Sequence, residues 1–141
     1  MLDHRGVKHF SIDAGGDIQT RGNNALGKPW SIGIRNPFNA EEIIKVIYPQ
    51  GKGIATSGSY ERGQHIYNPF NKTDQLTDIV SITVVGPNVL EADRYATAAF
   101  AMGELGASFI ESLPDFEAYM INKNSRAAMT SGFEALTSYT T

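Results

Sequence analysis

The sequence predicts a single domain of the α+β class, with a mainly antiparallel sheet and two packed helices. Three observations support this prediction. Glycines and prolines divide the first half of the chain into short apolar runs, one strongly signalled helix opens the second half, and no repeat, low-complexity block or linker interrupts the chain. The 141 residues suit one domain, 1–141, and 41% hydrophobic against 19% charged residues indicates that the chain buries a core.

The first half is expected to form six strands, each stopped by turn-forming residues. Gly15-Gly16 separates the first two strands and predicts a tight corner, because glycine adopts backbone conformations that other residues avoid. The last of the six is the clearest, since it is rich in β-branched residues and stops at Gly86-Pro87. The expected strands are residues 7–13, 17–20, 30–35, 43–48, 54–56 and 78–85.

The second half should begin with a helix that packs closely against the sheet. Asn88 is a candidate N-cap, Glu91 three residues later completes a pattern like a capping box, and Gly103 is the expected stop. The many alanines between these ends leave little bulk on the helix, which favours close packing against a sheet.

A second, shorter helix is expected at 104–113, before Pro114. Residues 116–122 alternate like a strand, and residues 125–130 can pair back on them after a turn at Lys123-Asn124. The tail from Ser131 carries no strong signal.

Composition excludes several classes of function. With 12 Lys and Arg against 15 Asp and Glu, the net charge is −3, and no basic stripe is present that could bind nucleic acid. The absence of cysteine excludes disulfides and thiolate metal sites. No window approaches the ~20 apolar residues of a membrane span, and the first residues do not resemble a signal peptide. The chain as written is expected to be cytosolic, or an internal piece of something longer.

Asp93 and Thr97 form the most suggestive chemical pair in the sequence. Their spacing places a carboxylate and a hydroxyl on one face of the expected helix, one turn apart. Hard oxygens placed in this way can hold Mg²⁺ or Ca²⁺. The alternative is a solvated aspartate beside a threonine whose hydroxyl bonds to a helix carbonyl. Spacing alone does not decide between them.

Two turns could approach a ligand closely. Gly15-Gly16-Asp17 and Thr56-Ser57-Gly58 each combine small residues with free backbone N–H groups, which suits a planar ring or a phosphate, although ordinary β-turns look the same. Trp30 could stack on a ring, or it could belong to the core. His65 could act as a general base, or it could be an exposed loop histidine.

In order along the chain, five blocks resemble the ApbE family, the FAD:protein FMN transferases. The resemblance covers residues from about 7 to 122, and the polar turn positions of the blocks make packing alone a poor explanation. The blocks are SIDAGGDI (11–18), PWSIGIRNP (29–37), ATSGSYER (55–62), HIYNP (65–69) and ADRYATA (92–98).

The resemblance implies an ApbE-like, T-fold-like fold and a Mg²⁺-dependent reaction. Enzymes of that family split FAD, move FMN onto a Thr or Ser hydroxyl of an acceptor flavoprotein, and release AMP. It makes Asp93 and Thr97 the expected metal ligands and His65 the expected base. The residues that it implies for flavin binding are Gly15, Gly16, Asp17, Trp30, Thr56, Ser57, Gly58 and His65.

The chain also departs from the family pattern. Gln64 precedes His65, Asn68 stands where the family has Asp, and Asn71-Lys72 replaces Thr-Gly. The resemblance covers only the C-terminal half of the family's enzymes, so we expect the isolated chain not to be fully active, and to self-associate through surface that the other half would cover. The alternative is a non-catalytic FAD-binding or structural module. Many enzymes of the family are exported lipoproteins, so the cellular location stays unknown, as does the acceptor.

Overall fold

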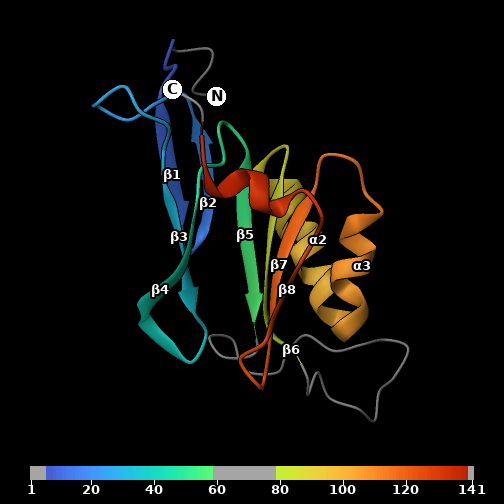
Figure 1. Ribbon diagram of the computed structural model, residues 1–141. Helices are drawn as coiled ribbons and strands as arrows, with labels where there is room; N and C mark the ends of the chain where they lie inside the picture. The colour runs from blue at the N-terminus through green and yellow to red at the C-terminus, as the bar shows by residue number, and fades with distance from the viewer. Residues whose placement is uncertain (1–5, 59–78, 140–141) are drawn as a thin grey trace.

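The computed structural model describes residues 6–58 and 79–139. An antiparallel six-stranded sheet separates two helices on one face from a two-stranded hairpin on the other (Figure 1). The sheet has the order β1 (Phe10–Ala14), β2 (Asp17–Arg21), β5 (Gly53–Gly58), β6 (Ile79–Gly86), β7 (Glu117–Asn122) and β8 (Ala127–Met129). The hairpin consists of β3 (Ile32–Asn36) and β4 (Asn39–Ile47), and the helices are α2 (Val89–Ala101) and α3 (Gly106–Glu111). The predicted α+β class is confirmed.

The central strands of the sheet are buried on both faces by two separate apolar clusters, whereas β1 and β8 are largely exposed. Side chains that alternate along β6 explain this, since Val84 faces the helices while its neighbour Val85 faces the hairpin. The helix-side cluster contains Ala55, Ile79, Ile82, Val84, Ala92, Ala96, Ala99, Phe100, Ile110, Ala118 and Met120. The hairpin-side cluster contains Ile34, Ile47, Ile54, Val85, Tyr119, Ile121 and Phe133.

Helix α2 begins as the sequence predicts. The Asn88 side chain accepts a hydrogen bond of 2.9 Å from the backbone N–H of Glu91. The Glu91 carboxylate lies 3.3 Å from Arg94, so it forms an ion pair one turn further on. The helix ends at Ala101, and Gly103 follows with a positive φ of 64°. The buried alanines confirm the close packing against the sheet.

Removing this N-cap should weaken the domain measurably. We expect Asn88→Ala to lower the free energy of unfolding by about 1 kcal/mol, because the Glu91 N–H then loses its partner. Urea denaturation followed by circular dichroism measures the change. Asn88→Asp keeps an acceptor and serves as the matched control. Equal losses in both variants would contradict the capping role.

Three expectations about the elements need correction. The fourth strand begins at Asn39 rather than at residue 43, because it pairs with β3 directly after the tight turn, where Asn36 faces Asn39. The second helix is not continuous over 104–113; it divides into the 3₁₀ turn η2 (Gly103–Leu105) and the short α3. The tail is structured as well, since the 3₁₀ helix η3 (Phe133–Thr137) buries Phe133 in the hairpin-side cluster.

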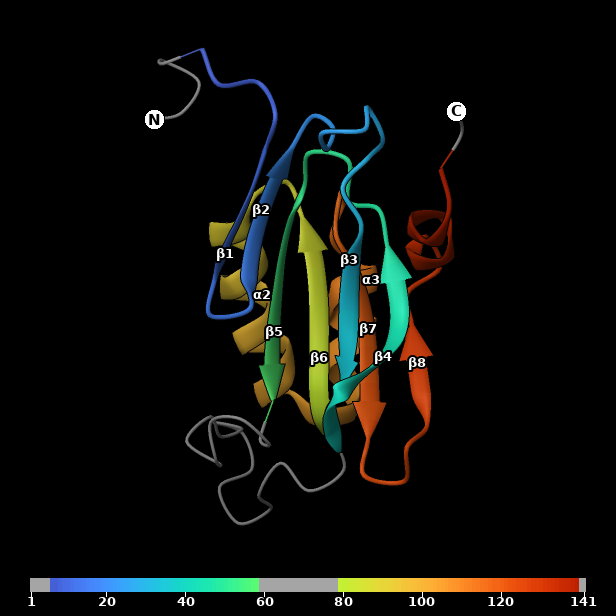
Figure 2. The same cartoon turned by 90° about the vertical axis from the view of Figure 1, so that its left-hand side faces the viewer.

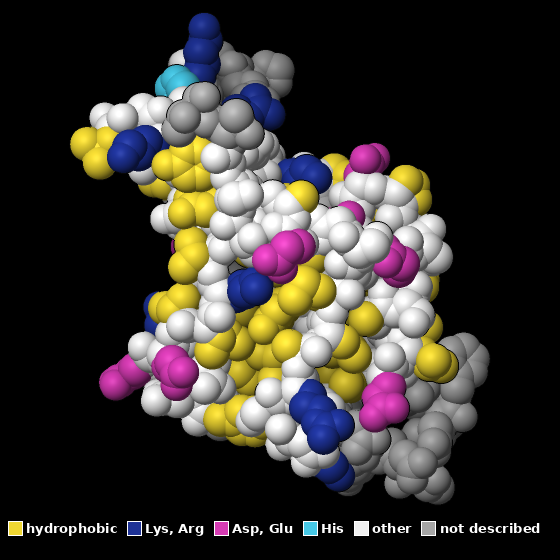
Figure 3. Space-filling view, viewed as in Figure 1, with side chains coloured by type: hydrophobic (Ala, Val, Ile, Leu, Met, Phe, Trp, Pro, Cys, Tyr) yellow, Lys and Arg dark blue, Asp and Glu magenta, His cyan; other side chains and the backbone are white. Residues whose placement is uncertain are grey.

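Apolar side chains remain at the surface on the side of the sheet that carries the hairpin. Figure 3 shows them gathered between β4 and β8, and Met129 in β8 is 39% exposed. Surfaces of this kind are commonly covered by a partner. The expected self-association stays a prediction. None of the helices among the described residues is long and apolar enough to cross a bilayer.

Candidate functional site

A cavity of about 430 Å³ lies between the sheet and the β3–β4 hairpin. Its floor comes from β5 and β6, its far wall from β3, and one side from the corner between β1 and β2 (Figure 2). A volume of this size is within the ~300–1,000 Å³ typical of small-molecule sites. Most of the wall is apolar, with Ile18, Ile32, Ile34, Ile43, Ile54 and Val80 among the lining residues.

The Gly15-Gly16 corner borders this cavity, as its sequence suggests. Both residues have a positive φ, 67° and 98°, and the carboxylate of Asp13 accepts a 2.8 Å hydrogen bond from the N–H of Gly16. No atom lies within 4 Å of where a Cβ would stand at either glycine. The backbone at this corner therefore makes a tight turn with free space beside it, which lets a flat ligand approach.

The end of β5 lies beside this corner but does not pair with it. Pairing between β2 and β5 is recorded at Ile18↔Ile54 and Gln19↔Gly53. In this antiparallel register Gly16 is level with Thr56, yet β5 from Thr56 to Gly58 pairs only with β6. Thr56 and Gly58 both line the cavity. Thr56-Ser57-Gly58 is not the turn that the sequence suggested, because it pairs with β6 as the last half of β5. The Gly15-Gly16 corner and this end of β5 meet at one opening of the sheet.

Two threonines and Ser81 form the polar part of the cavity floor. Thr56 and Thr83 are cross-strand partners on β5 and β6, and their hydroxyl oxygens lie 2.9 Å apart in a hydrogen bond. Both side chains line the cavity, and Thr83 is almost fully buried. Sequence analysis missed Thr83, because a threonine within a β-branched run is typical of a buried strand.

Asp93 and Thr97 lie on the opposite face of the sheet, on α2. Asp93 is half-buried at the edge of the packed face, seven residues before the buried Phe100, and Thr97 is exposed one turn after it. A carboxylate and a hydroxyl suit a hard cation. Among the described residues no group of three or more His, Cys, Asp or Glu is arranged to hold a metal. The pair would need its remaining ligands from elsewhere, and the expected metal site stays a prediction.

The Ser57 side chain lies on the helix side of the sheet. Its neighbour Ala55 belongs to the helix-side cluster, so the alternation of β5 points Ser57 to the same side as α2. The side chain is fully buried, and its hydroxyl has no hydrogen-bond partner in the described part of the chain. Such a group in a native fold calls for an explanation.

Ser57 and Thr97 lie at similar distances along β5 and α2 from the point where the two elements meet. The helix begins against the start of β5, where a Cβ on Gly53 would lie 2.0 Å from the nitrogen of Val89. Both elements then run the same way (Figure 2). Eight helical residues rise about 12 Å and four strand residues about 13 Å, so Ser57 and Thr97 lie at similar heights.

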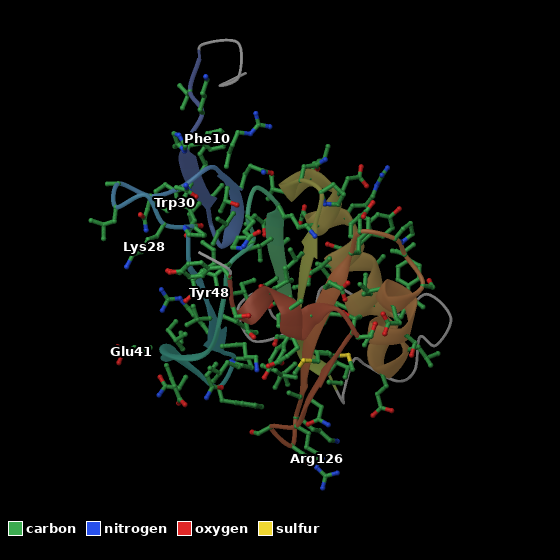
Figure 4. All side chains as sticks on the ribbon, turned by 45° about the horizontal axis from the view of Figure 1, so that its top comes forward. Phe10, Lys28, Trp30, Glu41, Tyr48 and Arg126 are labelled. Carbon is green, nitrogen blue, oxygen red and sulfur yellow. The ribbon has the colours of Figure 1, made fainter. Side chains whose placement is uncertain are left out.

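The other residues implied for flavin binding lie elsewhere or outside the described chain. Trp30 donates its indole N–H to the carbonyl of Arg21 at 3.1 Å and lies near Phe10, at the end of the molecule where β1 starts (Figure 4). Asp17 opens β2 and is half-buried. Neither lines the cavity. His65, the expected base, lies outside the described residues.

Comparisons with known proteins find relatives in one family. The model of the ApbE family matches residues 1–120. The FAD:protein FMN transferases of Salmonella typhimurium and Escherichia coli K12 are each 30% identical, over 139 and 132 residues, which is 92% and 87% of this chain but 40% and 38% of theirs.

Solved structures show the same likeness. The flavin transferase ApbE of Vibrio cholerae has a TM-score of 0.82 and 30% identity, covering 96% of this chain and 46% of that one. The ApbE protein of Thermotoga maritima has a TM-score of 0.79 and 25% identity, covering 93% and 45%. The chain thus spans about two fifths of the length of the curated relatives that it matches. On the family match, the identity and the shared fold together, the chain belongs to the ApbE family.

Proposed function

We propose that this chain is the metal- and flavin-contacting part of an FAD:protein FMN transferase. The observation that carries the proposal is the pair Asp93 and Thr97, one turn apart on α2, at the height of the Ser57 hydroxyl, which has no hydrogen-bond partner among the described residues. Relatives that cover 87% or more of this chain are named FAD:protein FMN transferase, which supports the same reaction.

The reaction joins an acceptor hydroxyl to the flavin phosphate. The oxygen of an acceptor Thr or Ser attacks the phosphorus on the FMN side of FAD, and a new P–O bond forms. The bond from that phosphorus to the bridging oxygen breaks, and AMP leaves with the bonding electron pair. The hydroxyl proton passes to a base, for which His65 is our candidate. Atoms and charge balance, because FAD and the acceptor become flavinylated acceptor and AMP.

Asp93 and Thr97 are the residues that would hold a Mg²⁺ ion. Asp93 supplies an ionic ligand and Thr97 a neutral one, and both are the hard oxygens that Mg²⁺ prefers. A bound Mg²⁺ neutralises negative charge on diphosphate oxygens and orients the group. Because our proposal draws two ligands from the described part of the chain, we expect tight metal binding only when FAD is present.

The cavity between sheet and hairpin is our candidate for the flavin ring. Gly15, Gly16, Thr56 and Gly58 line it, and they are four of the residues that the family resemblance implies for flavin. The flavin ring and the diphosphate then contact opposite faces of the sheet, around the end of β5 that does not pair with β2. In this proposal Ser57 donates its hydroxyl to a phosphate oxygen on the α2 side.

A second candidate function is a module that binds FAD without transferring FMN. The departures from the family pattern beside His65 favour this candidate, since Asn68 stands where the family has Asp. The two candidates differ in their need for metal. A module without chemistry has no use for Mg²⁺, and its affinity for FAD would not depend on Asp93.

The test is titration of FAD into the purified chain, with and without Mg²⁺, followed by flavin fluorescence. We expect Mg²⁺ to increase the affinity for FAD. Asp93→Asn should reduce this increase at least tenfold, because the only anionic metal ligand of the pair is lost. Glu104→Gln removes an equal charge at an exposed position in η2 and is the matched control.

Three outcomes are informative. Mg²⁺-dependent binding that disappears only in Asp93→Asn supports the transferase, and AMP release with an acceptor peptide is then measured. FAD binding that ignores both Mg²⁺ and Asp93 favours the non-catalytic module. Absence of FAD binding in every condition contradicts both functions for the isolated chain.

A further inference from the structure

The Thr56–Thr83 pair has hydrogen-bonding capacity that the fold does not use. Two hydroxyls carry two hydrogens, and only one of these lies between the two oxygens, 2.9 Å apart. The second hydrogen and the remaining lone pairs are directed at other groups. Because both side chains line the cavity, a ligand there can meet one donor and one acceptor side by side.

Three of the other polar side chains around the cavity are already engaged by the fold. Asp13 accepts from the backbone of Gly16, and Arg35 donates to the carbonyl of Ala40 at 2.8 Å. The amide of Asn36 donates to Glu42 and accepts from the backbone of Phe38. These groups close the corner and the hairpin. Ser31 and Ser81 also line the cavity, and the threonine pair differs from them by its cross-strand hydrogen bond.

The walls on either side of this pair favour a flat ligand. Ile18 and Ile54 lie on the β2–β5 side, and Ile34 and Val80 add further apolar surface. The corner at Gly15-Gly16 adds backbone without side chains. A flat apolar ring with a single polar edge suits such a slot, since the ring buries apolar surface while its edge reaches the floor.

We propose that the Thr56–Thr83 pair determines specificity by binding an imide edge, a ring N–H beside a carbonyl. The hydroxyl that keeps a free hydrogen donates to the ligand carbonyl, and the other oxygen accepts from the ring N–H. This inference rests on the proposed function. Within FAD, the dione end of the isoalloxazine has such an edge, whereas adenine has no carbonyl. The pair therefore directs the flavin ring, and not the adenine, into this cavity.

The probes are riboflavin, which has the imide N–H but no diphosphate, and its N3-methyl analogue, which lacks that N–H. We expect the wild-type chain to bind riboflavin about tenfold more tightly than the analogue, since one buried hydrogen bond is lost. Thr83→Val should weaken riboflavin about tenfold and remove the difference between the probes. Flavin fluorescence reports binding without Mg²⁺.

Thr20→Val is the matched control, because Thr20 is a fully buried strand threonine whose hydroxyl bonds to the carbonyl of Lys52, away from the cavity lining. Thr83→Ser keeps the hydroxyl and should keep the preference for riboflavin. If Thr83→Val fails to fold, the comparison of the two probes on the wild type and on Thr83→Ser decides, and equal affinities overturn the inference.

Two results separate this inference from the proposed function. If FAD binds but riboflavin does not, or if Thr83→Val folds and binds riboflavin unchanged, the ring is not read by this pair, while the transferase proposal stands. If neither FAD nor riboflavin binds, the proposed function fails for this chain and the inference fails with it.

Discussion

Replacing Gly53 with alanine is expected to lower the free energy of unfolding by about 3 kcal/mol or more. A Cβ at this position would lie 2.0 Å from the nitrogen of Val89 and 2.2 Å from the carbonyl carbon of Asn88. Both are backbone atoms at the start of α2, so no side chain can rotate away to relieve the overlap. The helix would have to move off β5. Urea denaturation of the purified variant measures the loss.

Gly33→Ala is the matched control for this substitution. Its Cβ would come within 2.9 Å of Ile43, but the atoms that it meets belong to a flexible side chain. We expect a cost of about 1 kcal/mol, because Ile43 can change rotamer at the cavity edge. Equal losses in the two variants would show that close backbone contact between β5 and α2 is not what Gly53 provides.

Phe133→Ala is the second substitution with a large expected effect, about 3–5 kcal/mol. Phe133 is fully buried, and its ring lies 5.3 Å from that of Tyr119. Truncation leaves a hole in the hairpin-side cluster that β7 and β4 cannot fill without moving. Because domains of this size are stable by only about 5–15 kcal/mol, a large share of the total would be lost. Thermal and urea unfolding both report it.

Leu26→Ala provides the comparison, since Leu26 is 80% exposed and should change stability by less than about 0.5 kcal/mol. Phe133→Leu fills most of the space and should recover more than half of the loss. An alanine variant as stable as the wild type would mean that η3 contributes nothing to the core.

The elements that the sequence predicted well are those with strong local signals. The run of β-branched residues in β6 and the cap at Asn88 act over a few neighbouring residues, so pattern alone places them within a residue or two. By contrast, η3 is five residues long and has no periodic pattern. Its anchor, Phe133, is buried only because β7 and β4 come together from distant parts of the chain.

The candidate site was predictable in its parts but not in its arrangement. Gly15, Gly16, Thr56 and Gly58 were singled out as turn residues, and they do share one cavity. Asp93 and Thr97 were expected on one helix face, and they lie there. The sequence does not show that a sheet separates these groups, because that depends on which strands pair. Thr83 was missed for the same reason, since its role comes from its partner across the strands.

Burial of β6 on both faces gives this strand a particular place in the motions of the domain. Every residue of β6 except Val80 is buried, and β5 and β7 hydrogen-bond to its two edges. No local opening can bring its central amides to water without separating the sheet. Their hydrogen–deuterium exchange should therefore follow global unfolding, and the slowest amides of Ile82 to Val85 give the stability of the whole domain in a native solution.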